Sequence, residues 1–173
     1  IEKLIVIERI EGVTMEYTAP KTPQQNGIVE RIFAFQYNKV RAMLNQAGIT
    51  DELRNKLWAE CASTATLLEN ASVRHDKSSH ELFFGKPSKI WKELRGFGEI
   101  VVVKKGGMRS KLENKGITCL MLGYQTNHPT GAYRLLNLST MKIIISRDVM
   151  WLNVFYDKHM NLQEAQKSHV TID

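Results

Sequence analysis

The apolar residues change their spacing near residue 94, and no other feature of the sequence constrains the fold as much. Before residue 94, apolar side chains recur every three to four residues, which is typical of helices that bury one face. After it they alternate with polar side chains, which is typical of β-strands. Short strands at close, regular spacing favour a barrel, so the sequence predicts an α+β chain that ends in a small β-barrel.

The helical part contains two long helices, predicted at residues 25–47 and 51–74 and separated by Gly48. We expect Trp58, beside the apolar stripe of the second helix, to anchor the core. Upstream, a short helix at residues 1–11 and one strand at residues 13–17 are predicted. A lone strand leaves its backbone groups unpaired, so its partners are expected later in the chain or outside it.

The strand-rich part follows a polar stretch. Lys86-Pro87-Ser88 is typical of a linker, and residues beyond 152 include few apolar side chains. Five strands are expected, at residues 99–104, 118–124, 132–138, 142–146 and 149–151. The predicted organisation is therefore a helical part at 1–85, a basic linker at 86–93, a barrel at 94–152 and a frayed tail at 153–173.

Positive charge is concentrated in one segment. The chain has a net charge of +6, and residues 86–115 contain nine bases against three acids, which accounts for the whole excess. A localised basic segment favours a polyanionic partner, and nucleic acid is the commonest one. A solvated linker and loop would have the same composition, and charge alone does not separate the two interpretations.

A turn at Thr22-Pro23-Gln24-Gln25-Asn26-Gly27 precedes the first long helix, and Glu30 follows within its first two turns. An acid there has an ordinary explanation, because a carboxylate near a helix N-terminus interacts favourably with the helix dipole. Glu30, Tyr37 and Arg41 fall on one face of the helix by their spacing.

Several classes of protein are disfavoured by the sequence. It has no run of eighteen apolar residues, so we expect no membrane span. Cys61 and Cys119 form no metal-binding motif, and we expect both to be buried apolar groups in a reducing, intracellular compartment. We read no signal peptide, and the missing initial Met suggests a processed chain or a fragment.

Short motifs over residues 12–152 resemble copia-type retrotransposon integrases. They occur in the same order as in that family: Ala19-Pro20, Thr22-Pro23-Gln24-Gln25-Asn26-Gly27, Glu30-Arg31, Arg41-Ala42-Met43-Leu44, Leu57-Trp58-Ala59-Glu60, Phe84-Gly85-Lys86-Pro87, Phe97-Gly98, Leu122-Gly123-Tyr124 and Ser146-Arg147-Asp148-Val149. The resemblance implies the end of an RNase-H-like catalytic core followed by an SH3-like domain.

The resemblance also implies a role for Glu30. In the family, this Glu is the third member of an Asp-Asp-Glu triad that binds Mg²⁺ or Mn²⁺ for DNA strand transfer. Residues 1–29 contain no Asp, so both partner acids are missing. We therefore expect a fragment or remnant of an integrase that binds no metal and catalyses nothing by itself.

The expected partner is DNA, bound through phosphates without base specificity, together with the remaining integrase half or a second copy of the chain. No membrane partner is expected, and the nucleus is the expected location. The candidate contacts are Gln24, Gln25, Asn26, Tyr37, Arg41, Lys86, Lys89, Lys92, Lys104, Lys105, Arg109 and Lys111. Tyr37 occupies a position where many integrases have a basic side chain that contacts DNA. A tyrosine ring there could instead stack on a nucleobase. The alternative is a non-catalytic SH3-like module that binds nucleic acid, chromatin or proteins of its own element.

Overall fold

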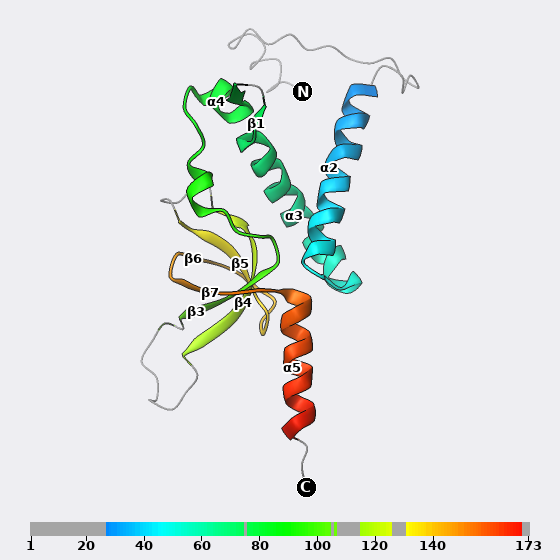
Figure 1. Ribbon diagram of the computed structural model, residues 1–173, viewed down its shortest axis with the longest axis vertical. Helices are drawn as coiled ribbons and strands as arrows, with labels where there is room; N and C mark the ends of the chain where they lie inside the picture. The colour runs from blue at the N-terminus through cyan, green and yellow to red at the C-terminus, as the bar shows by residue number, and fades with distance from the viewer. Residues whose placement is uncertain (1–26, 75, 105, 107–114, 126–130, 171–173) are drawn as a thin grey trace, which may run out of the picture. The chain divides into compact units, whose positions relative to one another are not determined.

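The computed structural model describes residues 27–74, 76–104, 106, 115–125 and 131–170 (Figure 1). The chain divides into two compact units, Ile1–Phe35 and Gln36–Asp173. Of the first unit only residues 27–35 are described, and they form the start of helix α2 (Gly27–Gln46). The helix and strand predicted at residues 1–17 lie outside the described residues.

The second unit begins with a helical hairpin. Helix α3 (Asp51–Ala71) follows the turn at Gly48, which has a φ of +63°. Helix α3 buries the apolar stripe predicted from its spacing, including Leu57 and Cys61, and Cys61 lies against α2 with its sulfur 3.7 Å from the carbonyl oxygen of Val40. The prediction for Trp58 is wrong. Its side chain is 50% exposed, because the position next to Leu57 lies about 100° around the helix from the buried stripe.

The connection between α3 and the sheet contains regular structure on both sides of Lys86-Pro87-Ser88, and the second half of the predicted linker, 89–93, is helical. Two short strands, β1 (Val73–Arg74) and β2 (Lys77–Ser78), pair with each other and lead into helix α4 (Ser79–Phe84) and the 3₁₀ helix η2 (Lys89–Glu93). The Ser78 hydroxyl caps α4 by accepting a hydrogen bond from the Glu81 amide at 3.1 Å. Ile90 of η2 packs against the core of the sheet, so this connection is attached to the fold.

The five predicted strands are confirmed. They form one antiparallel sheet in the order β6-β5-β4-β3-β7. Their bounds are β3 (Glu99–Lys104), β4 (Gly116–Tyr124), β5 (Tyr133–Asn137), β6 (Ile143–Ser146) and β7 (Val149–Phe155). Strands β6 and β7 pair on one side only, so the sheet is open where the sequence predicted a closed barrel. The α+β class is confirmed.

The sheet is buried on both faces at its centre. Because successive residues of a strand point to opposite faces, β4 contributes Leu120 and Leu122 to a core shared with α2 and α3, and Cys119 and Met121 to a core on the other face. All four side chains are fully buried. For β4 the predicted alternation of apolar and polar side chains is therefore wrong, because this central strand is apolar on both faces.

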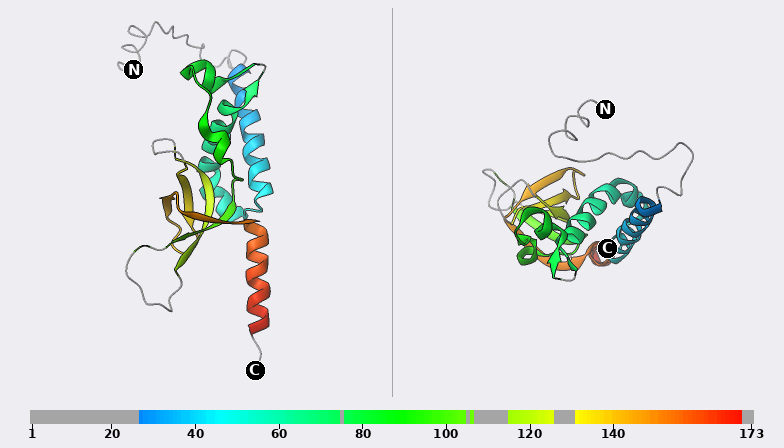
Figure 2. Two further views of the ribbon diagram at one scale, coloured as in Figure 1. Left: turned by 60° about the vertical axis from the view of Figure 1, so that its left-hand side comes forward. Right: turned by 90° about the horizontal axis from the view of Figure 1, so that it is seen from above.

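The frayed tail predicted after residue 152 is wrong. Strand β7 runs to Phe155 and is followed at once by helix α5 (Tyr156–Val170), which continues from the end of β7 (Figure 2). Tyr156 is buried, and the Asp157 amide donates to the carbonyl of Ala47 at 3.4 Å. The sequence did not indicate this helix because α5 is mostly polar and packs on the core near its start, through Tyr156 and Met160. No described helix is long and apolar enough to cross a membrane.

The hydrophobic core extends across the domain boundary predicted at residues 86–93. Helix α3 and the sheet contribute to one buried cluster, in which Leu57 and Ala65 join Ile100, Leu120 and Leu122. The compact units divide instead at residue 35, and residues 36–173 form one unit. We therefore expect α3 and the sheet to unfold together.

The substitution Leu57→Ala tests this shared core. Leu57 is 4% exposed, so the cavity should destabilise the unit by about 2–5 kcal/mol. Amide hydrogen exchange should show the same loss of protection in α3 and in β4. The exposed Leu82→Ala variant is the control and should change stability by less than about 0.5 kcal/mol. Loss of protection confined to the helices would support two separately folding parts.

Candidate functional site

Three of the predicted DNA-contacting bases lie close together in the connection between α3 and the sheet. Lys86 follows α4, and Lys89 and Lys92 lie on η2, where residues three apart fall on the same side of a 3₁₀ helix. All three side chains are exposed. Among the residues that the structure describes, none of the three forms an ion pair.

The fourth described base of this group, Lys104, lies elsewhere. It ends β3, five residues after Glu99, which corresponds to roughly 17 Å along the strand at about 3.3 Å per residue. Lys104 pairs in register with Gly116, the first residue of β4, so the exposed Lys115 just before β4 is close to it. The structure thus separates the basic segment into two groups at opposite ends of β3. Lys105, Arg109 and Lys111 lie outside the described residues.

The connection that contains Lys86, Lys89 and Lys92 is fastened to the sheet by hydrogen bonds. The Tyr133 hydroxyl donates to the Glu93 carbonyl at 3.3 Å. The Tyr124 hydroxyl accepts from the Arg95 amide at 2.8 Å and donates to the Arg95 carbonyl at 3.0 Å. Burial raises the pKa of Tyr124, which keeps its hydroxyl protonated as a donor. The three lysines are therefore presented on a fixed support.

Glu30, the candidate catalytic acid, is exposed in the first turn of α2 as the structure describes that helix. No group of three or more His, Cys, Asp or Glu side chains that could hold a metal ion occurs among the described residues. The described side chains therefore do not form a metal site around Glu30. Gln24, Gln25 and Asn26, which precede it, lie outside the described part of the chain.

Tyr37 and Arg41, the two remaining candidates, belong to the second unit. They are one helical turn apart on α2, and both are exposed, Tyr37 by 54%. An exposed ring beside an exposed guanidinium is compatible with contact to nucleic acid. Their placement on one face agrees with the spacing in the sequence.

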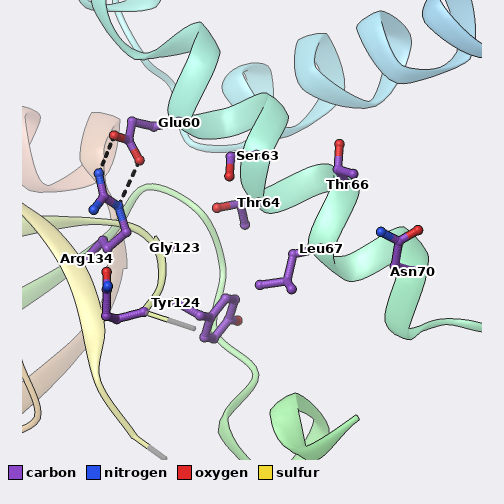
Figure 3. Close-up of a pocket in the computed structure, with 10 residues that line it drawn as sticks. Glu60, Ser63, Thr64, Thr66, Leu67, Asn70, Gly123, Tyr124 and Arg134 are labelled. Atoms are coloured by element: carbon purple, nitrogen blue, oxygen red, sulfur yellow. Dashed lines mark hydrogen bonds and ion pairs between the residues drawn. The ribbon is translucent and has the colours of Figure 1, made fainter. Parts of the chain in front are cut away.

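A groove of about 510 Å³ between α3 and strands β4 and β5 was not predicted (Figure 3). At one end Arg134 of β5 donates two hydrogen bonds to Glu60 of α3, at 2.6 and 3.1 Å. The hydrogen bond to Glu60 raises the pKa of Arg134, so the guanidinium stays charged. The Glu60 carboxylate neutralises that positive charge. These two residues are 74 positions apart, and no local sequence pattern signals their contact.

The described lining of the groove is mostly uncharged and polar. It includes the hydroxyls of Ser63 and Thr66, the amides of Asn70 and Gln125 and the carboxylate of Glu60, which is paired with Arg134; no His or Cys lines it among the described residues. The buried thiols lie elsewhere, and burial raises the pKa of Cys61 to about 12 and that of Cys119 to about 11. Both thiols are therefore protonated at neutral pH and poor nucleophiles.

Two comparisons with known proteins match this region of the chain. The family described as "Retroviral polymerase SH3-like domain" matches residues 101–163. The "Retrovirus-related Pol polyprotein from transposon TNT 1-94" of Nicotiana tabacum is 35% identical over 149 residues, which cover 81% of this chain. The chain belongs to the retrotransposon Pol polyproteins. The resemblance to the C-terminal region of copia-type integrases is thereby confirmed. No solved structure matches the chain.

This Pol segment is short compared with its relative, since it covers 10% of the length of the tobacco polyprotein. Within it the SH3-like match begins in β3 and ends at residue 163, inside α5. The match therefore includes the five-stranded sheet and the first half of α5. The helix that replaces the predicted tail is in part a component of the SH3-like domain.

One close contact in the Pol segment provides a test of how α3 packs on the sheet. The Thr64 hydroxyl donates to the Leu122 carbonyl at 2.6 Å, and a Cβ atom added to Gly123 would lie 2.3 Å from that hydroxyl oxygen. Glycine is required there because α3 approaches the strand closely, next to the register shift between Met121 and Gly123.

The Gly123→Ala substitution should destabilise the second unit by about 1–3 kcal/mol, because the new methyl group forces the Thr64 hydroxyl away from its partner. The same substitution in a Thr64→Ala background should cost less than about 1 kcal/mol, because the clashing atom is absent. A Thr64→Ser background retains the hydroxyl and should restore the larger cost. Urea unfolding measures all three, and equal costs in every background would contradict the contact.

Proposed function

We propose that this chain is the DNA-binding C-terminal part of a retrotransposon integrase and that it takes part in DNA integration. The observation that carries the proposal is the group of three exposed lysines, Lys86, Lys89 and Lys92, without ion-pair partners among the described residues. By contrast, Lys39 and Lys56 are paired with Glu69 and Glu52. Unpaired ammonium groups bind phosphates without first breaking a salt bridge.

Binding through phosphates follows from the residue type. Lysine is a flexible point charge and has no planar fork with which to recognise a particular base edge. The matching domain family and the polyprotein relative support a role with the DNA of the element, and an integrase would act in the nucleus. We therefore propose non-specific binding to duplex DNA, with affinity set by the salt concentration.

The Lys86→Gln, Lys89→Gln and Lys92→Gln triple variant tests this proposal. Each phosphate contact contributes about −0.9 to the slope of log K against log salt, so removing three charges should make the slope shallower by about 3. Fluorescence anisotropy with a labelled duplex at several salt concentrations gives the slope. The control is Lys56→Gln, since this lysine is already paired with Glu52 at 3.1 Å. An unchanged slope in the triple variant would exclude this surface.

We also propose that Glu30 supplies one ligand of the integrase metal centre, which two Asp residues from upstream of this chain would complete. The support is the order of the integrase-like motifs around it, because the described residues alone do not form a metal site. When bound, Mg²⁺ or Mn²⁺ would activate the attacking oxygen. The Glu30 carboxylate would coordinate that ion and offset part of its positive charge.

Glu30→Gln tests this role in a fusion with an upstream integrase half that supplies both Asp residues. The substitution keeps the size of the side chain and removes its charge, so strand transfer should fall by orders of magnitude. Without the fusion, the chain should bind Mn²⁺ no better than a surface carboxylate, as measured by calorimetry. An active fusion that is indifferent to Glu30→Gln would show that Glu30 is an ordinary acid of a first helical turn.

A further inference from the structure

Exposed aromatic rings lie beside the lysines in residues 83–92, which we call the 83–92 segment. Phe83 is 83% exposed, Phe84 59% and Trp91 45%. The order along the chain is two rings, then Lys86 and Lys89, then Trp91 and Lys92. From the sequence, the basic residues alone predict phosphate contacts, with no aromatic rings interleaved for stacking; the structure shows exposed rings beside these lysines.

Several contacts fasten the 83–92 segment to the rest of the fold. Gly85 has a φ of +69° and ends α4, a backbone geometry that favours glycine. His80 then contacts both sides of the turn: its Nδ1 lies 3.1 Å from the Lys86 carbonyl oxygen, and its ring centroid lies 4.7 Å from that of Phe84. Further on, Ile90 packs into the core below the sheet, while its neighbour Trp91 remains outside.

This arrangement has the two components of a site for single-stranded nucleic acid. Unpaired bases expose their flat faces and stack on aromatic rings, and the phosphates between them bind lysines. The bases of a duplex are stacked on each other and offer no free face to a ring. A rigid segment also loses little conformational entropy on binding, so more of the interaction energy appears as affinity.

We propose that the 83–92 segment binds single-stranded nucleic acid, with bases stacked on Phe83 and Trp91 and phosphates held by Lys86, Lys89 and Lys92. The inference rests on the proposed nucleic-acid binding and makes it specific for the strand form. An apolar protein partner would cover the rings but would leave three ammonium groups without counter-charge. The combination of rings and unpaired positive charge therefore favours a polyanion with flat faces.

The experiment compares the affinity of the full chain for a twelve-nucleotide dT strand, an rU strand of the same length and a duplex, all at one salt concentration. Phe83→Leu and Trp91→Leu keep an apolar side chain and remove the aromatic face. Each should weaken binding of single strands by about tenfold and leave duplex binding unchanged. The control is Trp58→Leu, which removes a ring of similar exposure, 50%, on α3. The dT and rU strands distinguish a DNA ligand from an RNA ligand.

A second measurement needs no variant that might fold poorly. Stacking of a base on Trp91 should quench tryptophan fluorescence when single strands are added to the unmodified chain, and the quenching should disappear in Trp91→Leu but persist in Trp58→Leu. Single strands that bind without quenching, or an equal loss of duplex and single-strand affinity in the ring variants, would overturn the inference.

The outcomes also separate this inference from the proposed function. Lysine-dependent duplex binding together with ring variants that bind single strands normally would leave the proposed function intact and overturn the stacking site. Failure of the chain to bind any nucleic acid would overturn both. Capture of a protein through Phe83 with no affinity for single strands would likewise overturn the inference and identify the rings as a protein interface.

Discussion

The packing of α3 on β4 is the contact on which the rest of the second unit depends. Strand β4 lies at the centre of the sheet and is buried on both faces. Helix α3 covers the face that carries Leu120 and Leu122. The Thr64 hydroxyl reaches the Leu122 carbonyl because residue 123 has no side chain in the way. The pair of Glu60 and Arg134 fixes the same helix to the next strand. These polar contacts set the position of α3 along the sheet, while the apolar core provides most of the stability.

Sequence patterns predicted the elements whose signal is local. All five strands of the sheet and both long helices lie within a few residues of their predicted positions, because alternation and helical periodicity report burial on one face. The failures have a different cause. Helix α5 is polar over most of its length and packs on the core through Tyr156 and Met160 near its start, so no periodic stripe marks it. The open edge between β6 and β7 depends on long-range pairing, which short-range patterns do not specify.

The sequence predicted the positive charge of the candidate site but not the exposure of its aromatic rings. The excess of lysine at residues 86–92 was evident from the composition, and the structure confirms that these side chains are exposed. The exposure of Phe83 and of Trp91 could not be derived, because an isolated aromatic residue in a short segment is more often buried than exposed. Trp58 was misjudged for the same reason. Spacing places a residue on a helix, but the neighbouring elements decide whether that face is covered.

The structured connection changes what the positive charge can do. Between α3 and β3 the chain passes through α4 and η2, and hydrogen bonds from the side chains of Tyr124 and Tyr133 hold its second end. Lysines on a flexible linker would lose conformational entropy with every phosphate they bind, whereas lysines on a fixed support lose only the freedom of their own side chains. Lys104 and Lys115 lie at the end of β3 far from this connection, and β3 itself is roughly 17 Å long at about 3.3 Å per residue. A polyanion that binds both groups must therefore follow the length of β3, which a strand several nucleotides long can do and an isolated phosphate cannot.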